Sequence, residues 1–80
     1  MVNETINLNS QVIVKDANQV DTVVMYLTAT LDGSIMNINI GVNTVNKTLA
    51  QANALSVKGQ YTDFDTAVQA KATELGFVIF

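Results

Sequence analysis

The sequence predicts an α+β domain: a three-stranded antiparallel meander with two helices packed on one face of the sheet and a short C-terminal strand. Three observations predict it. Apolar and polar residues alternate over three runs in the first half of the chain, helical spacing replaces the alternation in the second half, and a short apolar run closes the chain. Eighty residues (1–80) form a single domain, because they are too few for two independent cores.

The first alternating run lies near the N-terminus. One of its sides is apolar apart from a serine, and consists of Ile6, Leu8, Ser10, Val12 and Val14. A period of two is typical of a strand with one buried face. The polar segment at 16–21, DANQVD, follows and predicts a turn.

The second and third runs flank the dipeptide Asp32-Gly33. Each run has one apolar side, made of Val23, Met25, Leu27, Ala29 and Leu31 before the dipeptide and of Met36, Ile38, Ile40 and Val42 after it. Asp-Gly favours a two-residue type I′ turn. Pairing Leu31 with Ser34 then makes every facing pair apolar: Ala29–Met36, Leu27–Ile38, Met25–Ile40 and Val23–Val42. A loop one residue longer or shorter would set apolar against polar residues along the whole hairpin.

Helical spacing begins after the third run. The first helical stripe consists of Val45, Leu49, Ala52 and Leu55, with Asn43 or Thr44 as the N-cap. Gly59 is the predicted stop, although one long helix through it is the alternative, because the apolar phase continues from Val57 to Phe64.

The next helix begins at the sequence TDFD (62–65), which is similar to a capping box. Its buried stripe consists of Phe64, Ala67, Val68, Ala72 and Leu75. Gly76 followed by Phe77 predicts a Schellman stop. The last four residues, FVIF, are suited to a buried strand or a docked tail.

Composition excludes several classes of function. The chain has no Cys and no His, and its four cationic residues are all lysine, so zinc sites built on Cys or His, a histidine base and arginine clamps are excluded. Four scattered lysines and a net charge of −3 do not suit a nucleic-acid partner. We also expect no membrane span and no signal peptide, hence a cytoplasmic or virion-associated protein.

Two groups of carboxylates are the candidates for chemistry. Asp63 and Asp65 are the closest pair, but residues two apart on a helix point in different directions, and acids in a first turn are expected from capping. Asp16, Asn18 and Asp21 share a loop whose spacing does not match a calcium-binding loop. We therefore expect no catalytic residue, no cofactor and no metal site, and hence no enzyme.

A neutral surface is the candidate for binding. The polar sides of the three runs would form a flat face of amides and hydroxyls around one aromatic ring, which we predict as an interaction face: Asn7, Asn9, Gln11, Tyr26, Thr28, Asn37 and Asn39. As an alternative, this face is simply the wetted side of an antiparallel sheet.

The strands at 22–31 and 34–42 carry no charge and no proline. Sheet edges usually carry charged residues or proline, because unpaired backbone groups at an edge would otherwise pair with other strands. Charged residues make up only 14% of the chain, against about 25% in typical domains. Either the FVIF run or the helices cover the edge, or another subunit does. We therefore expect a component of a homo-oligomer or a larger assembly, which acts through protein contacts.

The segments INLNSQVIVKD, YLTATLDG followed by MNINI, and YTDFDTAVQAKATELGF together resemble small uncharacterised proteins of phages and prophages of Gram-positive bacteria. Such proteins often lie among tail and lysis genes. The resemblance implies a virion or tail accessory role, or a role in contact with the host, and transfers no site residue. The alternative function is a small inhibitor or regulator that binds a host protein through the amide-rich face.

Overall fold

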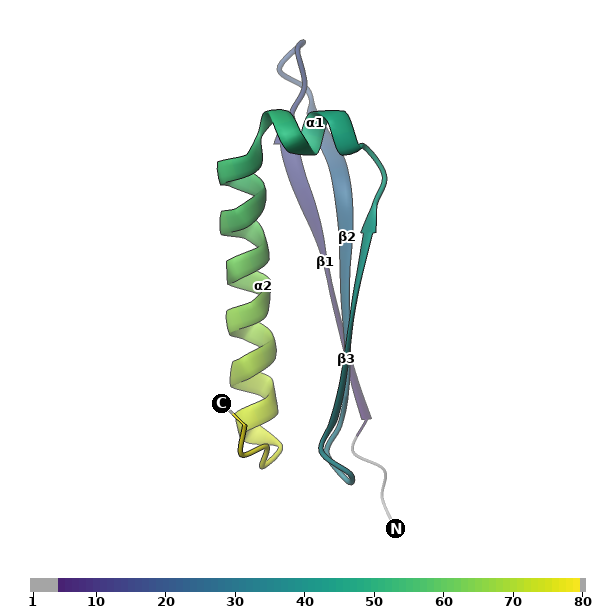
Figure 1. The fold of residues 1–80 in the computed structure, drawn as a ribbon, viewed down its shortest axis with the longest axis vertical. Helices are drawn as coiled ribbons and strands as arrows, with labels where there is room; N and C mark the ends of the chain where they lie inside the picture. Colours follow the sequence, from purple (N-terminus) through teal and green to yellow (C-terminus); the bar gives the residue numbers. More distant parts are fainter. Residues whose placement is uncertain (1–4, 80) are drawn as a thin grey trace.

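A computed structural model describes residues 5–79 and has an elongated shape of 51 × 20 × 15 Å. Three antiparallel strands, in the order β1-β2-β3, form one sheet (Figure 1). Two helices follow, so the predicted α+β meander with two helices is confirmed. The elements are β1 (Thr5–Lys15), β2 (Asp21–Asp32), β3 (Asn37–Thr44), α1 (Lys47–Ala52) and α2 (Ala54–Glu74).

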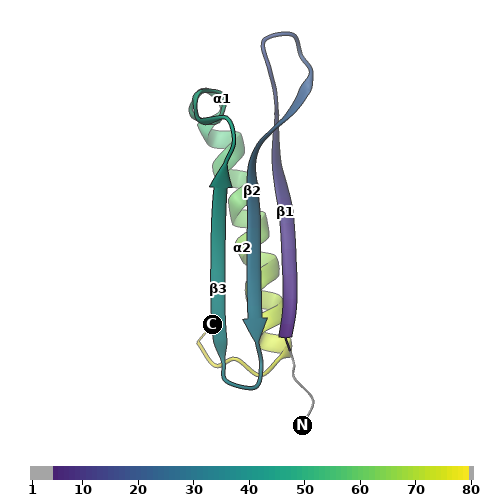
Figure 2. The same ribbon diagram turned by 90° about the vertical axis from the view of Figure 1, so that its right-hand side faces the viewer.

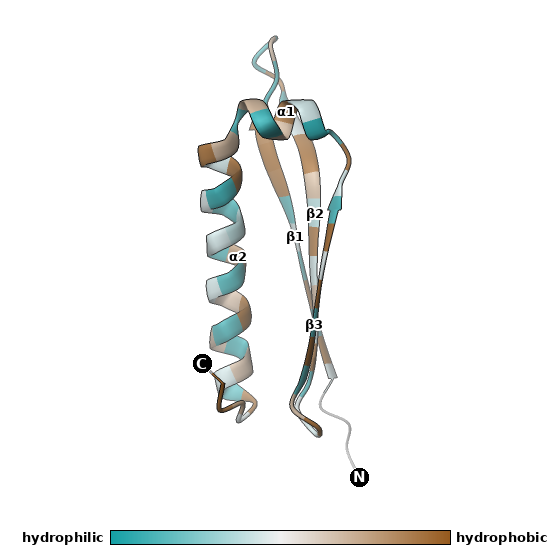
Figure 3. Ribbon diagram, viewed as in Figure 1, coloured by the Kyte–Doolittle hydropathy of each residue, from teal (hydrophilic) through white to brown (hydrophobic). Residues whose placement is uncertain are grey.

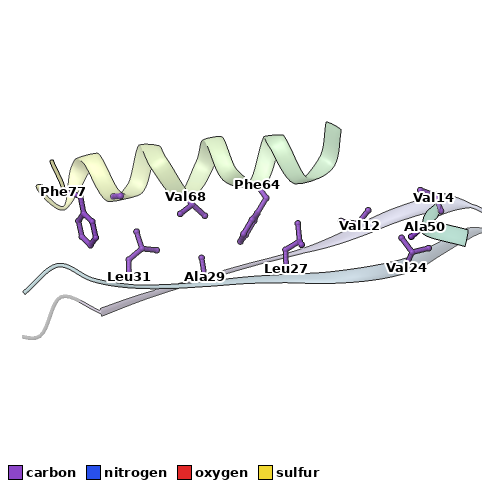
Figure 4. Close-up of a cluster of buried hydrophobic side chains, with 11 residues drawn as sticks. Val12, Val14, Val24, Leu27, Ala29, Leu31, Ala50, Phe64, Val68 and Phe77 are labelled. Carbon is purple, nitrogen blue, oxygen red and sulfur yellow. The ribbon is translucent and has the colours of Figure 1, made fainter. Parts of the chain in front are cut away.

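The long helix α2 lies along one face of the sheet and leaves the other face uncovered (Figures 1 and 2). Side chains of β2 point at the helix, where Leu27 and Leu31 meet Phe64 and Val68 in a dry layer (Figure 4). Each such side chain stabilises the fold by about 1.5–3 kcal/mol. The predicted helical stripe is confirmed at Phe64, Val68 and Ala72, whereas Leu75 is half-buried and Ala67 is exposed.

The β2–β3 hairpin keeps the predicted faces but not the predicted register. Asp32 pairs with Asn37, so the loop spans the four residues 33–36, and the type I′ turn is wrong. The Asp32 carboxylate accepts hydrogen bonds from the Ser34 amide at 3.0 Å and the Ser34 hydroxyl at 2.6 Å, which closes a wider turn. Met36 therefore lies in the turn at φ 55°, exposed rather than in the core.

The register moves by four residues, an even number, so each side chain that remains paired stays on its predicted face. Leu27 now pairs with Val42 and Leu31 with Ile38. All these apolar residues still share one side of the sheet, because side chains alternate with a period of two. The prediction that apolar residues face one another across the hairpin is therefore confirmed, but all four predicted pairs are wrong.

A bulge changes the phase of β2 near its start. Val12 pairs with Met25 but Ile13 pairs with Val23, so Val24 is the extra residue. Val24 is fully buried, whereas the prediction placed Val23 on the apolar side. The Val24 carbonyl accepts hydrogen bonds from the next two backbone amides beyond β3, at 2.9 and 3.2 Å. The bulge thus ties the link between β3 and α1 to the centre of the sheet.

Helix α1 begins after Asn46, whose side chain accepts a hydrogen bond from the Leu49 amide at 3.0 Å. The predicted caps at Asn43 and Thr44 are wrong, because both residues lie within β3 and pair with β2. The helical half does break, but at Asn53, whose side chain donates back to the Leu49 carbonyl at 2.9 Å.

Helix α2 runs without a break through Gly59, which corrects the predicted stop and supports the one-helix alternative from Ala54 onward. Thr62, the predicted start of the second helix, instead donates its hydroxyl to the Lys58 carbonyl at 2.9 Å, a bond inside the helix. A glycine within a helix costs about 1 kcal/mol relative to alanine. Burial of Phe64, Val68 and other side chains on the same helix exceeds that cost.

The C-terminal stop is confirmed as a Schellman motif. Gly76 has φ 91°, its amide donates to the Thr73 carbonyl at 3.1 Å, and the Phe77 amide donates to the Ala72 carbonyl at 2.9 Å. The Phe77 ring closes the core at the C-terminal end of α2 (Figure 4). Residues 77–79 form no strand, so the predicted C-terminal strand is not confirmed over them, and Phe80 lies outside the described residues. The amides near Phe77 go to the helix end instead of to a sheet.

Candidate functional site

The uncovered side of the sheet, which we call the outer face, is built from alternate residues of all three strands. Register places the predicted residues together in cross-strand rows, the central two being Asn9–Thr28–Gly41 and Gln11–Tyr26–Asn43. All seven predicted residues share this face. The outer face consists of Asn7, Asn9, Gln11, Tyr26, Thr28, Thr30, Asn37, Asn39, Gly41 and Asn43.

Thr30, Gly41 and Asn43 were absent from the predicted set, although each continues the same alternation. Thr30 donates its hydroxyl to the Asn7 side-chain oxygen at 2.9 Å across β1 and β2. The remaining amides of the face are exposed to solvent. Cross-strand pairs of this kind contribute a few tenths of a kcal/mol to 1 kcal/mol each and also orient the side chains.

Gly41 and Thr28 form the most closely packed point of the outer face. A Cβ atom built on Gly41 would lie 2.7 Å from the Thr28 Oγ1. Only a residue without a side chain leaves the Thr28 hydroxyl its present place. In the middle of the face, the Thr28 side chain therefore occupies space that a side chain at position 41 would otherwise fill.

Charges on this side of the sheet lie at its two ends. Lys15 and Asp21 form an ion pair at 3.0 Å beside the β1–β2 turn, and Asp32 lies at the opposite end. Of the four rows between them, the three that cross all strands contain only amides, hydroxyls, glycine and the ring of Tyr26, whose exposed fraction is 40%, and the fourth consists of Ile13 and Val23. A neutral surface with one aromatic ring suits hydrogen bonding and stacking more than the attraction of ions.

The helix side of β3 is a second open surface. Helix α2 covers β1 and β2, and the exposed fractions of Ile40 and Val42 remain 43% and 54%. A shallow groove runs between β3 and α2, lined by Met25, Val42, Val57, Lys58, Tyr61 and Thr62. Apolar colouring accordingly extends along β3 (Figure 3). The sequence predicted these residues as core, because alternation indicates which side a residue faces but not which helix covers it.

The carboxylate candidates are not brought together. Asp65 accepts a hydrogen bond from Gln69 on the next helical turn at 2.8 Å, whereas Asp63 borders a hollow beside β1. Asp16 accepts the backbone amides of Asn18 and Val20 at 2.8 and 3.0 Å and so shapes its own turn. Within residues 5–79, no three acidic side chains gather in the way a metal ion requires.

Comparison with protein families, with curated proteins and with solved structures finds no match for this chain. In the described part of the chain, neither helix has the length and apolar character that spanning a bilayer requires. The surfaces themselves therefore carry the functional argument.

Proposed function

We propose that the protein is a non-enzymatic interaction component of a homo-oligomer or larger assembly, and that the outer face is one of its contact surfaces. A single observation carries this proposal: three consecutive rows that cross all three strands are uncharged and uncovered by any described helix. A surface that meets only water is usually rich in charged residues. Interface cores, in contrast, are depleted in charge and enriched in tyrosine.

The finer form of this role, a virion or tail accessory protein of a phage, depends on the resemblance of the sequence and not on the geometry. Such particles are built from repeated protein contacts. A chain with few charges and two open surfaces is suited to them.

A second candidate is an inhibitor or regulator that holds one host protein on the outer face. Tyr26 favours it, because the ring is exposed on the outer face and is flanked by the amides of Gln11 and Asn43. Aromatic anchors surrounded by hydrogen-bonding groups are typical of binding hot spots.

Chemical footprinting of the two tyrosines tests the proposal, because each tyrosine reports on a different surface. Tyr26 lies on the outer face and Tyr61 on the helix side, with exposed fractions of 40% and 36%. Nitration or hydroxyl-radical labelling, read by mass spectrometry, is compared between the isolated chain and its purified assembly. We expect Tyr26 to be protected in the assembly.

Thr28→Lys and Thr66→Lys form the matched variant and control. Both exchange an exposed threonine for lysine, the first at the centre of the outer face and the second on α2. Thr28→Lys should abolish assembly and the protection of Tyr26, and Thr66→Lys should preserve both. If Tyr26 reacts equally in the free and assembled states, the outer face is not the contact surface.

A further inference from the structure

The two edges of the sheet differ in how they are guarded. At β1, the side-chain amide of Gln60 pairs with the backbone of Ile13 as a strand would: the Ile13 amide donates to Oε1 at 2.9 Å, and Nε2 donates to the Ile13 carbonyl at 2.7 Å. Ser56 accepts a further bond from Nε2 at 3.0 Å, which holds the amide in place. Helix α2 therefore blocks part of the β1 edge.

The β3 edge has none of the usual guards. Within residues 5–79, β3 pairs with β2 alone, in continuous register over eight residues without a bulge. Its residues include no charge and no proline. An edge of this kind is a template for another strand.

We propose that β3 pairs with β3 of a second copy, antiparallel and about a two-fold axis at Ile40, to form a continuous six-stranded sheet. The inference rests on the proposed role in an assembly and names the partner at a surface separate from the outer face. The occupant is a second copy because the edge complements itself.

Self-complementarity follows from the alternation of side chains. Antiparallel pairing centred on Ile40 sets Ile40 against its own copy and Ile38 against Val42 on the helix side. On the outer face, the same pairing sets Asn39 against Gly41. If the two-fold axis passed through Gly41 instead, Ile38 would face Thr44. The axis at Ile40 therefore gives the better match of apolar residues.

Charge and strand length agree with a second copy. No charge lies between Asp32 and Lys47, so two β3 strands oppose no like charges although each chain has a net charge of −3. Antiparallel pairing also brings the Asp32 end of one strand beside the Lys47 end of the other. A strand of eight residues is about 27 Å long. The contact would extend over the length of this strand and, on the helix side, over the apolar residues of β3.

The groove on the helix side completes the interface. Tyr61 and Val57 line it from α2, and Val42 lines it from β3. Each α2 would lie about 10 Å, or two strand spacings, from the two-fold axis. The two copies of Tyr61 extend into the space between the helices, next to the Val42 side chains that line the same groove. Dimer formation therefore protects Tyr61 and leaves Tyr26 reactive.

Light scattering and sedimentation over a range of concentrations test the dimer with the purified chain. Ile40→Lys sets two lysines against each other at the axis and should raise the dimer Kd roughly 100-fold or more. Val20→Lys is the matched control, because Val20 is also an exposed apolar residue, 56% against 43% for Ile40, but lies in the β1–β2 turn, away from both β3 and the outer face. The proposal is overturned if the parent chain stays monomeric at millimolar concentration, or if Ile40→Lys dimerises as well as the parent.

Disulfide trapping tests the register without relying on a disruptive variant. The parent has no cysteine, so one introduced thiol is unambiguous. At the axis, opposite Cα atoms lie about 4.5–5.5 Å apart, within disulfide range, so Ile40→Cys should cross-link under mild oxidation. Ile38→Cys should not, because its copy lies roughly 13 Å away along the strands. Equal cross-linking of the two variants contradicts the axis at Ile40.

The two proposals fail separately. A monomeric chain whose assembly still protects Tyr26 overturns the β3 pairing and keeps the proposed function. A cross-linked dimer whose outer face is never protected supports the pairing and removes the outer face as a contact.

Discussion

Gly41→Ala tests the packing of the outer face, because its effect should depend on Thr28. The added Cβ would lie 2.7 Å from the Thr28 Oγ1, too close for both atoms to stay in place. Gly41 is the residue opposite Thr28 in the β2–β3 register, and nothing else is within 4 Å of that Cβ. The conflict is therefore between two named atoms.

Two opposing effects give the magnitude. Alanine in a strand is favoured over glycine by about 0.5–1 kcal/mol, because the unfolded chain loses freedom. Turning Thr28 away from its rotamer costs about 0.5–1.5 kcal/mol. Gly41→Ala should therefore change the free energy of unfolding by less than about 1 kcal/mol in the parent. In a Thr28→Ala background, the same change should stabilise by about 0.5–1 kcal/mol.

Urea denaturation of the four chains measures the coupling as a double-mutant cycle. Thr28→Val is the matched control, because a methyl group occupies the place of the hydroxyl and retains the conflict. The reasoning is refuted if Gly41→Ala has the same effect in the parent and Thr28→Ala backgrounds, within about 0.3 kcal/mol.

Four further variants test the fold. Gly59→Ala should stabilise by about 0.5–1 kcal/mol in thermal or urea unfolding, because the helix is continuous there and nothing lies within 4 Å of the added Cβ; a loss of stability would contradict the single α2. Gly76→Ala should destabilise by about 1–2 kcal/mol, since its φ of 91° disfavours any side chain, and an unchanged melting temperature would argue against the Schellman stop. Gln60→Ala should cost about 1–2 kcal/mol through the two lost bonds to Ile13, and should speed hydrogen exchange at the Ile13 amide, whereas unaltered exchange would mean that the guard is absent. Leu27→Ala removes a fully buried side chain and should cost about 2–5 kcal/mol of the roughly 4–12 kcal/mol expected for a chain of this size; a cost below 1 kcal/mol would place Leu27 outside the core.

Predictions from the sequence were most successful where one residue determines its own neighbourhood. Gly76 and Phe77 formed the predicted helix stop, because a glycine at positive φ and the following apolar residue satisfy the last carbonyls locally. The outer face likewise follows from alternation alone, since every residue of a strand faces opposite to its neighbour.

Predictions were less successful where two distant segments compete. Asp32-Gly33 favours a two-residue turn, yet Asp32 instead hydrogen-bonds Ser34 and the loop doubles in length. Gly59 is a plausible stop in isolation, but burial of the helix against the sheet outweighs the local cost. The alternation of residues does not predict the bulge at Val24. The bulge is held by hydrogen bonds that the Val24 carbonyl accepts from backbone amides beyond β3, far away in the sequence.

By itself, the sequence determined the class of fold, the side on which the strand residues lie outside the bulge at Val24, and the neutrality of the outer face, because these depend on the order of side chains along the backbone. Only the tertiary structure decided which strands the helix covers. The placement of α2 over β1 and β2 guards one edge through Gln60 and leaves Ile40 and Val42 exposed at the other. The physical reason is that one helix about 10 Å wide cannot cover three strands spaced roughly 4.8 Å apart, and its position depends on packing between segments far apart in the chain.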